Sequence, residues 1–479
     1  MGDKTKKVDS IFSKKEINGM FDGPILKVLR KLALPIFLGM IFQVLYSVVD
    51  TIWISRIDLT DPSYVGGVGM IFPLIFLVIA LGSGLLIGVS SLVARAIGEK
   101  NRYVLNRTAE SGLIVGSFFA VSLLILGYTF DEGLIKLLGA KGDYYLHALE
   151  YFRFMIPAGV LMLLGNVFNG ILQGEGLMKK IMVSMIIATV ANMALDPVFI
   201  FLLGMGVRGA GLATVLSQLI AAVYVLNIFF KKNTLVQIEW KLKNISLDII
   251  KKIVGVGFPQ TAGQMTMAVS FLFFNRIVVG IDPLALTAFS LCGRLDMILI
   301  MPILAIGSSL ITMIGQNYGR RNYERVKDIW RVCLLTAVVV LLFLASLMVI
   351  FAPKIYQFFS DVDQVVIYAA LQTRIVEFSF ILAAVAILGR ASFQALGKPI
   401  PGLIIVVLRI AGVAIPMVYF YVYVLNLGIY GVWFGIMSGN AVSAVVSLIW
   451  VNRKLKSLLL FERPELPLSV ELMEDLAID

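Results

Sequence analysis

The stretch LALPIFLGMIFQVLYSVVDTIWIS, residues 32–55, decides the fold of this chain, because it is long and apolar enough to cross a bilayer as one helix. Its only charged residue is Asp50. A second such stretch, IMVSMIIATVANMALDPVFIFLLG at residues 181–204, has Asp196 as its only charge. A carboxylate at bilayer depth costs about 2.5 kcal/mol or more, so acids within spans usually serve a function. Both aspartates are therefore candidate functional residues.

The composition extends this interpretation to the whole chain. Of the 479 residues, 59% are hydrophobic and only 15% are charged, whereas about 25% of residues are charged in a typical soluble protein. Apolar stretches of spanning length recur roughly at residues 31–54, 64–94, 109–130, 150–172, 181–203, 209–230, 253–279, 284–315, 329–352, 367–390, 400–423 and 429–452. We therefore predict an all-α integral membrane protein with twelve transmembrane helices.

Basic residues collect in every second loop. The richer set comprises Arg95, Lys100, Arg102, Arg107, Lys179, Lys180, Lys231, Lys232, Lys241, Lys243, Lys251, Lys252, Arg320, Arg321, Arg325, Lys327 and Lys398. The poorer set comprises Arg56, Lys136, Lys141, Arg208 and Lys354. Positive charge favours the cytoplasmic side, so we predict a multi-pass protein of the cell membrane with both termini in the cytoplasm. Basic cytoplasmic loops that face anionic lipid headgroups account for the net charge of +11. The charge therefore gives no reason to expect a nucleic acid partner.

The second half of the sequence repeats the first. Four motifs recur in the same order 221 to 224 residues later: ALPIFLGMIFQ as GFPQTAGQMTM, AIGEKNRY as NYGRRNYER, ILQGEG as SFQALG, and GVRGAGLA as GIYGVWFG. Each half holds six predicted helices, so both copies enter the membrane from the same side. This parallel repeat predicts two six-helix lobes with a substrate cavity between them.

The repeat divides the chain into four parts. We predict an N-lobe at residues 1–230 with a short basic N-terminal segment, a C-lobe at residues 253–455 and a tail at residues 456–479. The linker between the lobes, residues 231–252, is polar and basic, and we expect it to form an amphipathic helix on the cytoplasmic surface.

Two pairs of repeated residues suggest local roles. Pro35 and Pro259 lie inside spans, where a proline removes a backbone hydrogen bond and favours a kink or hinge, although membrane helices also tolerate proline without that role. Gly98 and Gly319 precede basic turns, and we predict that they are helix C-caps.

Oxygen-bearing side chains accompany the two aspartates. Asn192 and Asp196 are four residues apart and therefore share one helix face, and the proline after Asp196 frees a carbonyl one turn earlier. Together with Asp50 they could hold a proton or Na⁺ through oxygen. Thr214 and Asn166, at bilayer depth in neighbouring helices, are candidates to complete the site. The alternative is that the aspartates bond only to local backbone.

The second half has no counterpart of these oxygens. With the repeat offset, the corresponding positions are Phe274 or Asn275 for Asp50, Val413 for Asn192, Met417 for Asp196 and Ile436 for Thr214. Packing alone does not demand such a difference, since both halves should pack alike. The asymmetry therefore indicates an ion-coupled transporter whose coupling site lies in the first half.

Other charged residues fall within the predicted spans of the second half. Arg294 and Asp296 are expected to pair locally, and Arg374 and Glu377, three residues apart, are expected to form an ion pair. Arg409 lies inside the eleventh predicted helix and is expected to meet one of these acids.

Taken together, these motifs resemble the multidrug and toxic compound extrusion (MATE) family. The resemblance rests on residues 32–55, the turns ARAIGEKN and QNYGRRN, and the motifs NGILQGEG, NMALDPVFI and GVRGAGLATVLSQ, and extends from about residue 25 to residue 455. It implies a V-shaped, two-lobed antiporter with a central cavity, which exports organic, often cationic amphiphilic compounds in exchange for H⁺ or Na⁺ by alternating access.

The resemblance also implies site residues. The ion-coupling positions of N-lobe-coupled members match Asp50, Asn192, Asp196, Thr214, Asn166 and Tyr151, and Asp50, Asp196 and Asn192 would be the ligands of a coupled Na⁺. The candidate substrate-cavity or secondary residues are Gln43, Pro35, Pro259, Gln264, Glu377 and Asp296.

One branch of the family carries acids in the seventh and tenth helices. Here the seventh helix has Gln264 and no acid, and the tenth has Ile381 near the expected position with Glu377 a turn earlier. This difference favours the archaeal-type and DNA-damage-inducible-protein-F-like branches, in which the coupling site lies in the N-lobe.

Other classes of protein fit less well. A flippase or exporter of a lipid-linked or other amphiphilic metabolite would need several cationic residues to hold a pyrophosphate, and the first half offers few beyond Arg153. A single histidine, with no HExxH and no Ser/His/Asp set, argues against an enzyme, and the lack of GxxxxGK[ST] argues against an ATP-driven pump. We expect no catalytic residues and no cofactor besides the coupling ion. The expected partners are small organic molecules and the lipid bilayer, and we expect the protein to be a monomer.

The loop charges make a prediction about topology. Single cysteines at Asn101, Asn233 and Asn322, introduced into a cysteine-free background, should react with a membrane-impermeant thiol reagent only from the cytoplasmic side. Cysteines at Asp61 and Asp143 should react only from outside. Labelling of intact cells and of inverted vesicles measures both. Reaction at position 233 from outside would invert the topology and the direction of transport.

Overall fold

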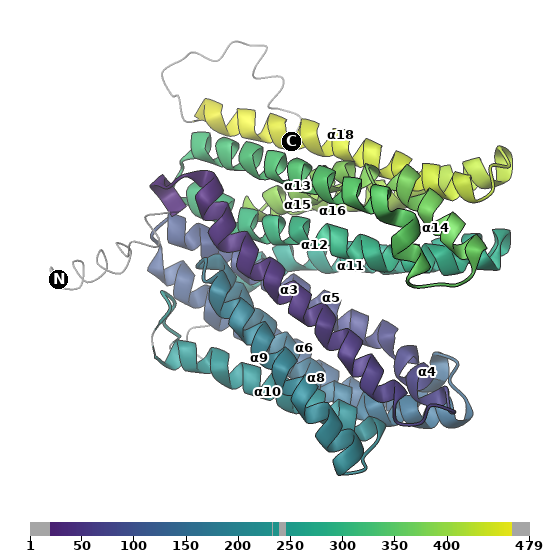
Figure 1. Ribbon diagram of the computed structural model, residues 1–479. Helices are drawn as coiled ribbons and strands as arrows, with labels where there is room; N and C mark the ends of the chain where they lie inside the picture. The colour runs from purple at the N-terminus through teal and green to yellow at the C-terminus, as the bar shows by residue number, and fades with distance from the viewer. Residues whose placement is uncertain (1–19, 232, 239–245, 462–479) are drawn as a thin grey trace. The chain divides into compact units, whose positions relative to one another are not determined.

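The computed structural model describes residues 20–231, 233–238 and 246–461, and all regular secondary structure within them is helical (Figure 1). The first half contains α3 (Ile25–Ser55), α4 (Ser63–Met70), α5 (Phe72–Gly98), α6 (Arg102–Thr129), α7 (Asp131–Leu137), α8 (Gly142–Gly174), α9 (Met178–Pro197), η1 (Val198–Leu202) and α10 (Val207–Phe230). The second half contains α11 (Leu247–Ile281), α12 (Pro283–Gly319), α13 (Tyr323–Gln357), α14 (Asp363–Val376), α15 (Ser379–Ala395), α16 (Ile400–Val407), η3 (Leu408–Ala414), α17 (Ile415–Tyr419), η4 (Phe420–Val424) and α18 (Ile429–Phe461). The segments η1, η3 and η4 are π-helices.

The number of membrane spans agrees with the sequence. Among the described residues, eleven helices are long and apolar enough to cross a membrane. A twelfth span is broken, because α14 and α15 meet around Glu377 and Phe378 with a bend of 57°. Apolar stretches become helices in lipid because only internal hydrogen bonds can satisfy their backbone. The prediction of a twelve-helix integral membrane protein is confirmed, with its tenth span bent.

The described residues form two compact units. One comprises residues 30–97 and 101–262, and the other comprises residues 20–29, 98–100 and 263–461. The division falls inside α11, and not in the predicted linker, because the first turns of α11 pack on α5. A Cβ on Gly84 would lie 2.8 Å from the Gly257 carbonyl oxygen, and the Thr261 hydroxyl donates to the Ala80 carbonyl at 3.1 Å.

The amphipathic helix predicted for the linker is wrong at residues 233–238, which are not helical. Residues 239–245 lie outside the described residues, and α11 has already begun at Leu247. Side chains at the ends of α6, α8 and α9 hold the backbone of this segment. The bonds run from Leu235 and Val236 N–H to Glu175, from Gln237 N–H to Asn106, and from the Lys180 ammonium to the Asn233 carbonyl. These bonds replace the hydrogen bonds that a helix would make.

The backbone carries the internal repeat. Residues with positive φ occur in equivalent pairs 221 or 222 residues apart: Lys100 and Arg321, Gly176 and Gly397, Gly204 and Asn426, and Gly206 and Gly428. A positive φ is uncommon for residues other than glycine, so its recurrence at Lys100 and Arg321 shows that one turn geometry is used twice. We predicted Gly98 and Gly319 as helix C-caps, but they are the last residues of α5 and α12. The residues with positive φ, Lys100 and Arg321, follow two positions later.

Helix packing repeats as well. Within one unit α6, α8 and α10 pack together with α9, and within the other α12, α13, α15 and α18 do so (Figure 1). A Cβ on Gly39 would lie 2.7 Å from the Met185 sulfur, and one on the equivalent Gly263 would lie 3.8 Å from Val406, the equivalent of Met185. Both halves are therefore built on one scaffold, and differences between them reside in the side chains.

The two repeated prolines lie inside continuous helices. Pro35 is within α3 and Pro259 is within α11. Each removes one backbone hydrogen bond from its helix. A hinge at these positions stays a prediction.

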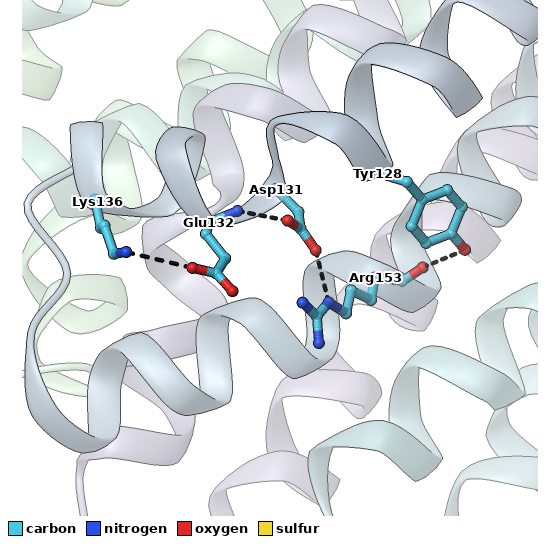
Figure 2. Close-up of polar contacts among 5 residues, drawn as sticks. All are labelled: Tyr128, Asp131, Glu132, Lys136 and Arg153. Carbon is cyan, nitrogen blue, oxygen red and sulfur yellow. Dashed lines mark hydrogen bonds and ion pairs between the residues drawn. The ribbon is translucent and has the colours of Figure 1, made fainter.

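An ion pair joins α7 to α8 in the first unit (Figure 2). Arg153 Nε donates to Asp131 Oδ2 at 2.6 Å, and the Glu132 N–H donates to Asp131 Oδ1 at 2.7 Å. The Tyr128 hydroxyl donates to the Arg153 carbonyl at 3.0 Å. Burial raises the pKa of Asp131, but the bonds from Arg153 and Glu132 outweigh it and hold that pKa below its ordinary value. Arg153 is thus engaged in holding the fold together.

Asp131→Asn should lower the free energy of unfolding by about 1 kcal/mol at pH 7, a modest loss because Arg153 is half exposed. The folded-state pKa of Asp131 is depressed, so its contribution is complete above about pH 4 and disappears as the pH falls through that pKa. Thermal unfolding of the solubilised protein at pH 7 and pH 3 measures the difference. Glu132→Gln, which removes only an exposed pair with Lys136, is the matched control. An equal deficit of Asp131→Asn at both pH values would contradict this assignment.

Candidate functional site

Helix α9 presents the central carboxylate of the candidate site. Asp196 and Asn192 are fully buried, and the Asn192 amide donates to Asp196 Oδ1 at 3.2 Å. The two residues meet because four residues make about one helical turn. After Pro197 the chain continues as the π-helix η1, so the acid lies just before a change in helix geometry.

Helices α3, α8 and α10 bring further polar groups to this acid. Asp50 on α3 and Tyr151 on α8 are buried, and both lie close enough to interact electrostatically with each other, while Asp50 also interacts with Asp196. Thr214 on α10 is 2% exposed and its hydroxyl lies 3.1 Å from the hydroxyl of Tyr46. Four helices therefore converge on one buried polar cluster: Asp50, Tyr46, Tyr151, Asn192, Asp196 and Thr214.

Three oxygens of this cluster have no hydrogen-bond donor among the residues that the structure describes. They are Asp50 Oδ1, Asn192 Oδ1 and Asp196 Oδ2. A buried acceptor without a donor costs about 1–3 kcal/mol. The two carboxylate oxygens could accept a proton, and all three oxygens could coordinate a hard cation. No group of three acidic, histidine or cysteine side chains suited to a metal occurs among the described residues. A Na⁺ ion here would therefore rely on amide and hydroxyl oxygens beside the two carboxylates.

Two residues differ from the sequence-based expectation. Tyr46 was not predicted, although it precedes Asp50 by four residues and so shares its helix face. Asn166 is not shown near the acids: its amide donates to the Met162 carbonyl of its own helix at 2.9 Å, and it packs where a Cβ on Gly82 would lie. The four-residue spacing that predicted the contact of Asn192 with Asp196 could also have placed Tyr46 beside Asp50.

The second half fills the equivalent space with a tryptophan. Gln372 and Trp433 occupy the positions of Tyr151 and Gly211, and the Trp433 indole donates to the Gln372 side chain at 3.1 Å. Trp433 is only 1% exposed. In the first half, Gly211 has no side chain, and Phe154 and Tyr151 of α8 lie where one would begin. The two halves therefore fill this position differently, with a buried indole in the second and with side chains of α8 in the first.

The acids of the second half do not form the predicted pairs. Glu377 is 1% exposed and its Oε1 has no hydrogen-bond partner, so the predicted pair with Arg374 is wrong. The i, i+3 rule requires a continuous helix, and the helix breaks at Glu377. Glu377 instead interacts electrostatically with Asp296 on α12. The predicted pairing of Asp296 with Arg294 is likewise not among the ion pairs of the described residues.

Arg409 has no acidic partner among the described residues either, so the predicted contact with Asp296 or Glu377 is wrong. It lies in η3, close enough to Arg390 in α15 for the two positive charges to interact. Of the remaining candidates, Gln43 is exposed and Gln264 is half buried, so both are accessible to molecules outside the helix core.

Both halves of the chain match the MatE family model, over residues 35–198 and 259–420. The chain is 23% identical to Multidrug export protein MepA of Staphylococcus saprophyticus, covering 89% of this chain and 93% of MepA. It is 24% identical to Probable multidrug resistance protein NorM of Thermotoga maritima, covering 89% and 92%. A solved MOP superfamily transporter from Pyrococcus furiosus, described by a reverse polarity of its binding pocket that suggests a different function, has a TM-score of 0.86 and 30% identity, covering 92% and 98%.

The unpaired oxygens lead to a prediction about stability. Asp50→Asn and Asp196→Asn keep the shape of each side chain but remove a charge from an apolar setting, so neither should lower the thermal stability of the solubilised protein. Asp131→Asn, which breaks a satisfied ion pair, should lower it and is the matched control. A loss at Asp196→Asn larger than that at Asp131→Asn would mean that Asp196 holds the fold together.

Proposed function

Because the chain belongs to the MATE family of membrane transporters, we propose that it is a secondary-active exporter, which moves organic cationic amphiphiles out of the cell in exchange for H⁺ or Na⁺. Like its relatives, the chain is a multi-pass transporter and not an enzyme. Asp50 and Asp196 would bind the coupling ion, and the protein would work by alternating access.

One observation carries the assignment of the coupling site. Asp50, Asn192 and Asp196 each have a buried oxygen with no donor among the described residues. The second half of the chain has no equivalent of these three residues. Such oxygens gain a partner when a proton or cation arrives. Ion binding can drive exchange only if it favours the conformation that has the lower affinity for the exported molecule.

The surrounding residues would tune this event. Asn192 donates to one oxygen of Asp196 and leaves the other for the ion. The hydroxyls of Thr214 and Tyr46 are hydrogen-bonded, and Tyr46 lies on α3 together with Asp50. A shift of α10 would therefore move the surroundings of Asp50. Neutralising one carboxylate would also relieve the repulsion between Asp50 and Asp196.

A second candidate function is export of an anionic or lipid-linked amphiphile. It is favoured by the arginines Arg390 and Arg409 in the second half, which form no ion pair with an acid in the part of the chain that the structure describes. The related transporter from Pyrococcus furiosus, with its pocket of reverse polarity, is a further reason to test substrates of both charges.

The test is transport in vesicles with one gradient at a time. Purified protein is reconstituted, and ethidium movement is followed with an imposed proton gradient, an imposed sodium gradient, or neither. Asp50→Asn and Asp196→Asn should each reduce the gradient-driven rate by at least about tenfold, because the coupling ion loses its charged partner. The gradient that drives the wild type identifies the ion.

Glu377→Gln and Asp296→Asn are the matched controls, since each neutralises a membrane acid of the second half. Both variants should keep the dependence of ethidium movement on the gradient. If Glu377→Gln uncouples transport while Asp196→Asn remains coupled, the coupling site lies in the second half and the proposal fails.

A further inference from the structure

Two arginines of the second unit lie within membrane spans without an anionic partner. Arg390 is in α15 and Arg409 is in η3, and both are half buried. Arg390 Nη1 is buried and has no hydrogen-bond partner. No ion pair joins either guanidinium to an acid among the described residues. A guanidinium in this setting is costly unless something pairs with it.

The Arg390 side chain lies against glycines of two neighbouring helices, α16 and α11. A Cβ on Gly402 of α16 would lie 2.9 Å from Arg390 Cγ, so the stem of this side chain passes over that glycine. The tip reaches α11, where a Cβ on Gly263 would lie 3.5 Å from Arg390 Nη1 and 3.8 Å from Val406. The two glycines thus make room for the guanidinium between three helices.

Arg409 belongs to the same place. Gly402, Val406 and Arg409 are spaced by four and three residues, so they follow one face of the α16–η3 segment. That face packs on Arg390, and the charge of Arg409 acts on the Arg390 guanidinium. Two like charges held together repel each other, and an anion bound between them would remove the repulsion.

The helical segments that hold the two guanidiniums supply no acid to fill this role. The sequences of α15, α16 and η3 contain no acid, and neither does α11 from Gly263 onward. Glu377 precedes Arg390 by thirteen residues, which is about 20 Å along a helix. The equivalent positions in the first half are Asn169 and Ala188, so the two charges are specific to the second half. Arg153 of the first half, in contrast, is paired with Asp131 (Figure 2).

We propose that Arg390 and Arg409 form an oxyanion-binding site that takes the phosphate head of an anionic amphiphile. Guanidinium groups bind phosphate through pairs of parallel N–H bonds, and the apolar α16, with sequence IPGLIIVV, offers a surface for an alkyl chain. The head would belong either to a bilayer phospholipid or to a transported molecule. The site is separate from Asp50 and Asp196 and does not depend on the export of cations.

The test measures binding of dodecyl phosphate to the full-length protein in a non-ionic detergent by calorimetry. Dodecyltrimethylammonium, with the same chain and the opposite charge, and inorganic phosphate, with no chain, are the comparison ligands. Arg390→Gln and Arg409→Gln should each weaken the binding of dodecyl phosphate by at least about tenfold. Arg331→Gln, which removes an exposed arginine from α13, is the matched control and should bind as the wild type does.

Two further variants keep the result interpretable. Arg390→Lys and Arg409→Lys retain the charge but lose the planar fork, so they should show a smaller loss of binding. Without ligand, Arg390→Gln should be at least as thermally stable as the wild type, because it removes an unpaired charge. A marked loss of stability would show that Arg390 pairs within the protein, and would overturn the proposal. So would dodecyl phosphate binding equally to Arg390→Gln, Arg409→Gln and the wild type, or dodecyltrimethylammonium binding as tightly as dodecyl phosphate.

Reconstituted vesicles distinguish the two sources of the head group. If phosphatidylglycerol in phosphatidylcholine vesicles competes with dodecyl phosphate for the wild type alone, the site holds a bilayer lipid. If the protein instead moves dodecyl phosphate across pure phosphatidylcholine vesicles, and Arg390→Gln does not, the site holds cargo. Asp196→Asn should bind dodecyl phosphate normally in either case, so a failure of ion coupling and a failure of this site give different results.

Discussion

The absence of water inside a bilayer is the constraint on which the rest of this structure depends. Backbone groups must be satisfied within helices, and the side chains that cover them are apolar. Each charged side chain inside a span therefore carries a high free-energy cost. Asp131 and Arg153 meet this cost by pairing where the spans end. Asp50, Asp196 and Arg390 keep polar atoms that find no partner among the described residues, which is why they carry the functional argument.

Duplication provides one scaffold with two different interiors. The packing of Gly39 on Met185 recurs as that of Gly263 on Val406, and the turns at Lys100 and Arg321 share their backbone geometry. The polar contents differ, and buried Trp433 of the second half stands where the first half has Gly211. A scaffold whose helix contacts depend on small residues and shared turns can exchange its charged side chains without changing its fold.

The parts predicted from sequence were those governed by local periodicity and by the repeat. Twelve spans follow from apolar length, and the Asn192–Asp196 contact follows from their four-residue spacing. The predicted ion pair Arg374–Glu377 was wrong because the helix bends at Glu377, so the two side chains do not share one helix face. Composition does not reveal such a bend. The linker failed because Glu175 and Asn106, distant in sequence, bind its backbone. Tertiary contacts of this kind leave no periodic signal in the chain.

The depth of the two acids has a consequence for membrane voltage. Asp50 is five residues from the end of α3 at Ser55, or about 8 Å along the helix axis, and by the predicted topology that end faces outside. A cation entering from outside would cross only a small part of the electric field before it is bound. It would cross most of the field on its way to the cytoplasm, where each charge gains about 2.3 kcal/mol per 100 mV. Voltage should therefore act mainly on release of the ion to the inside, and only weakly on its capture.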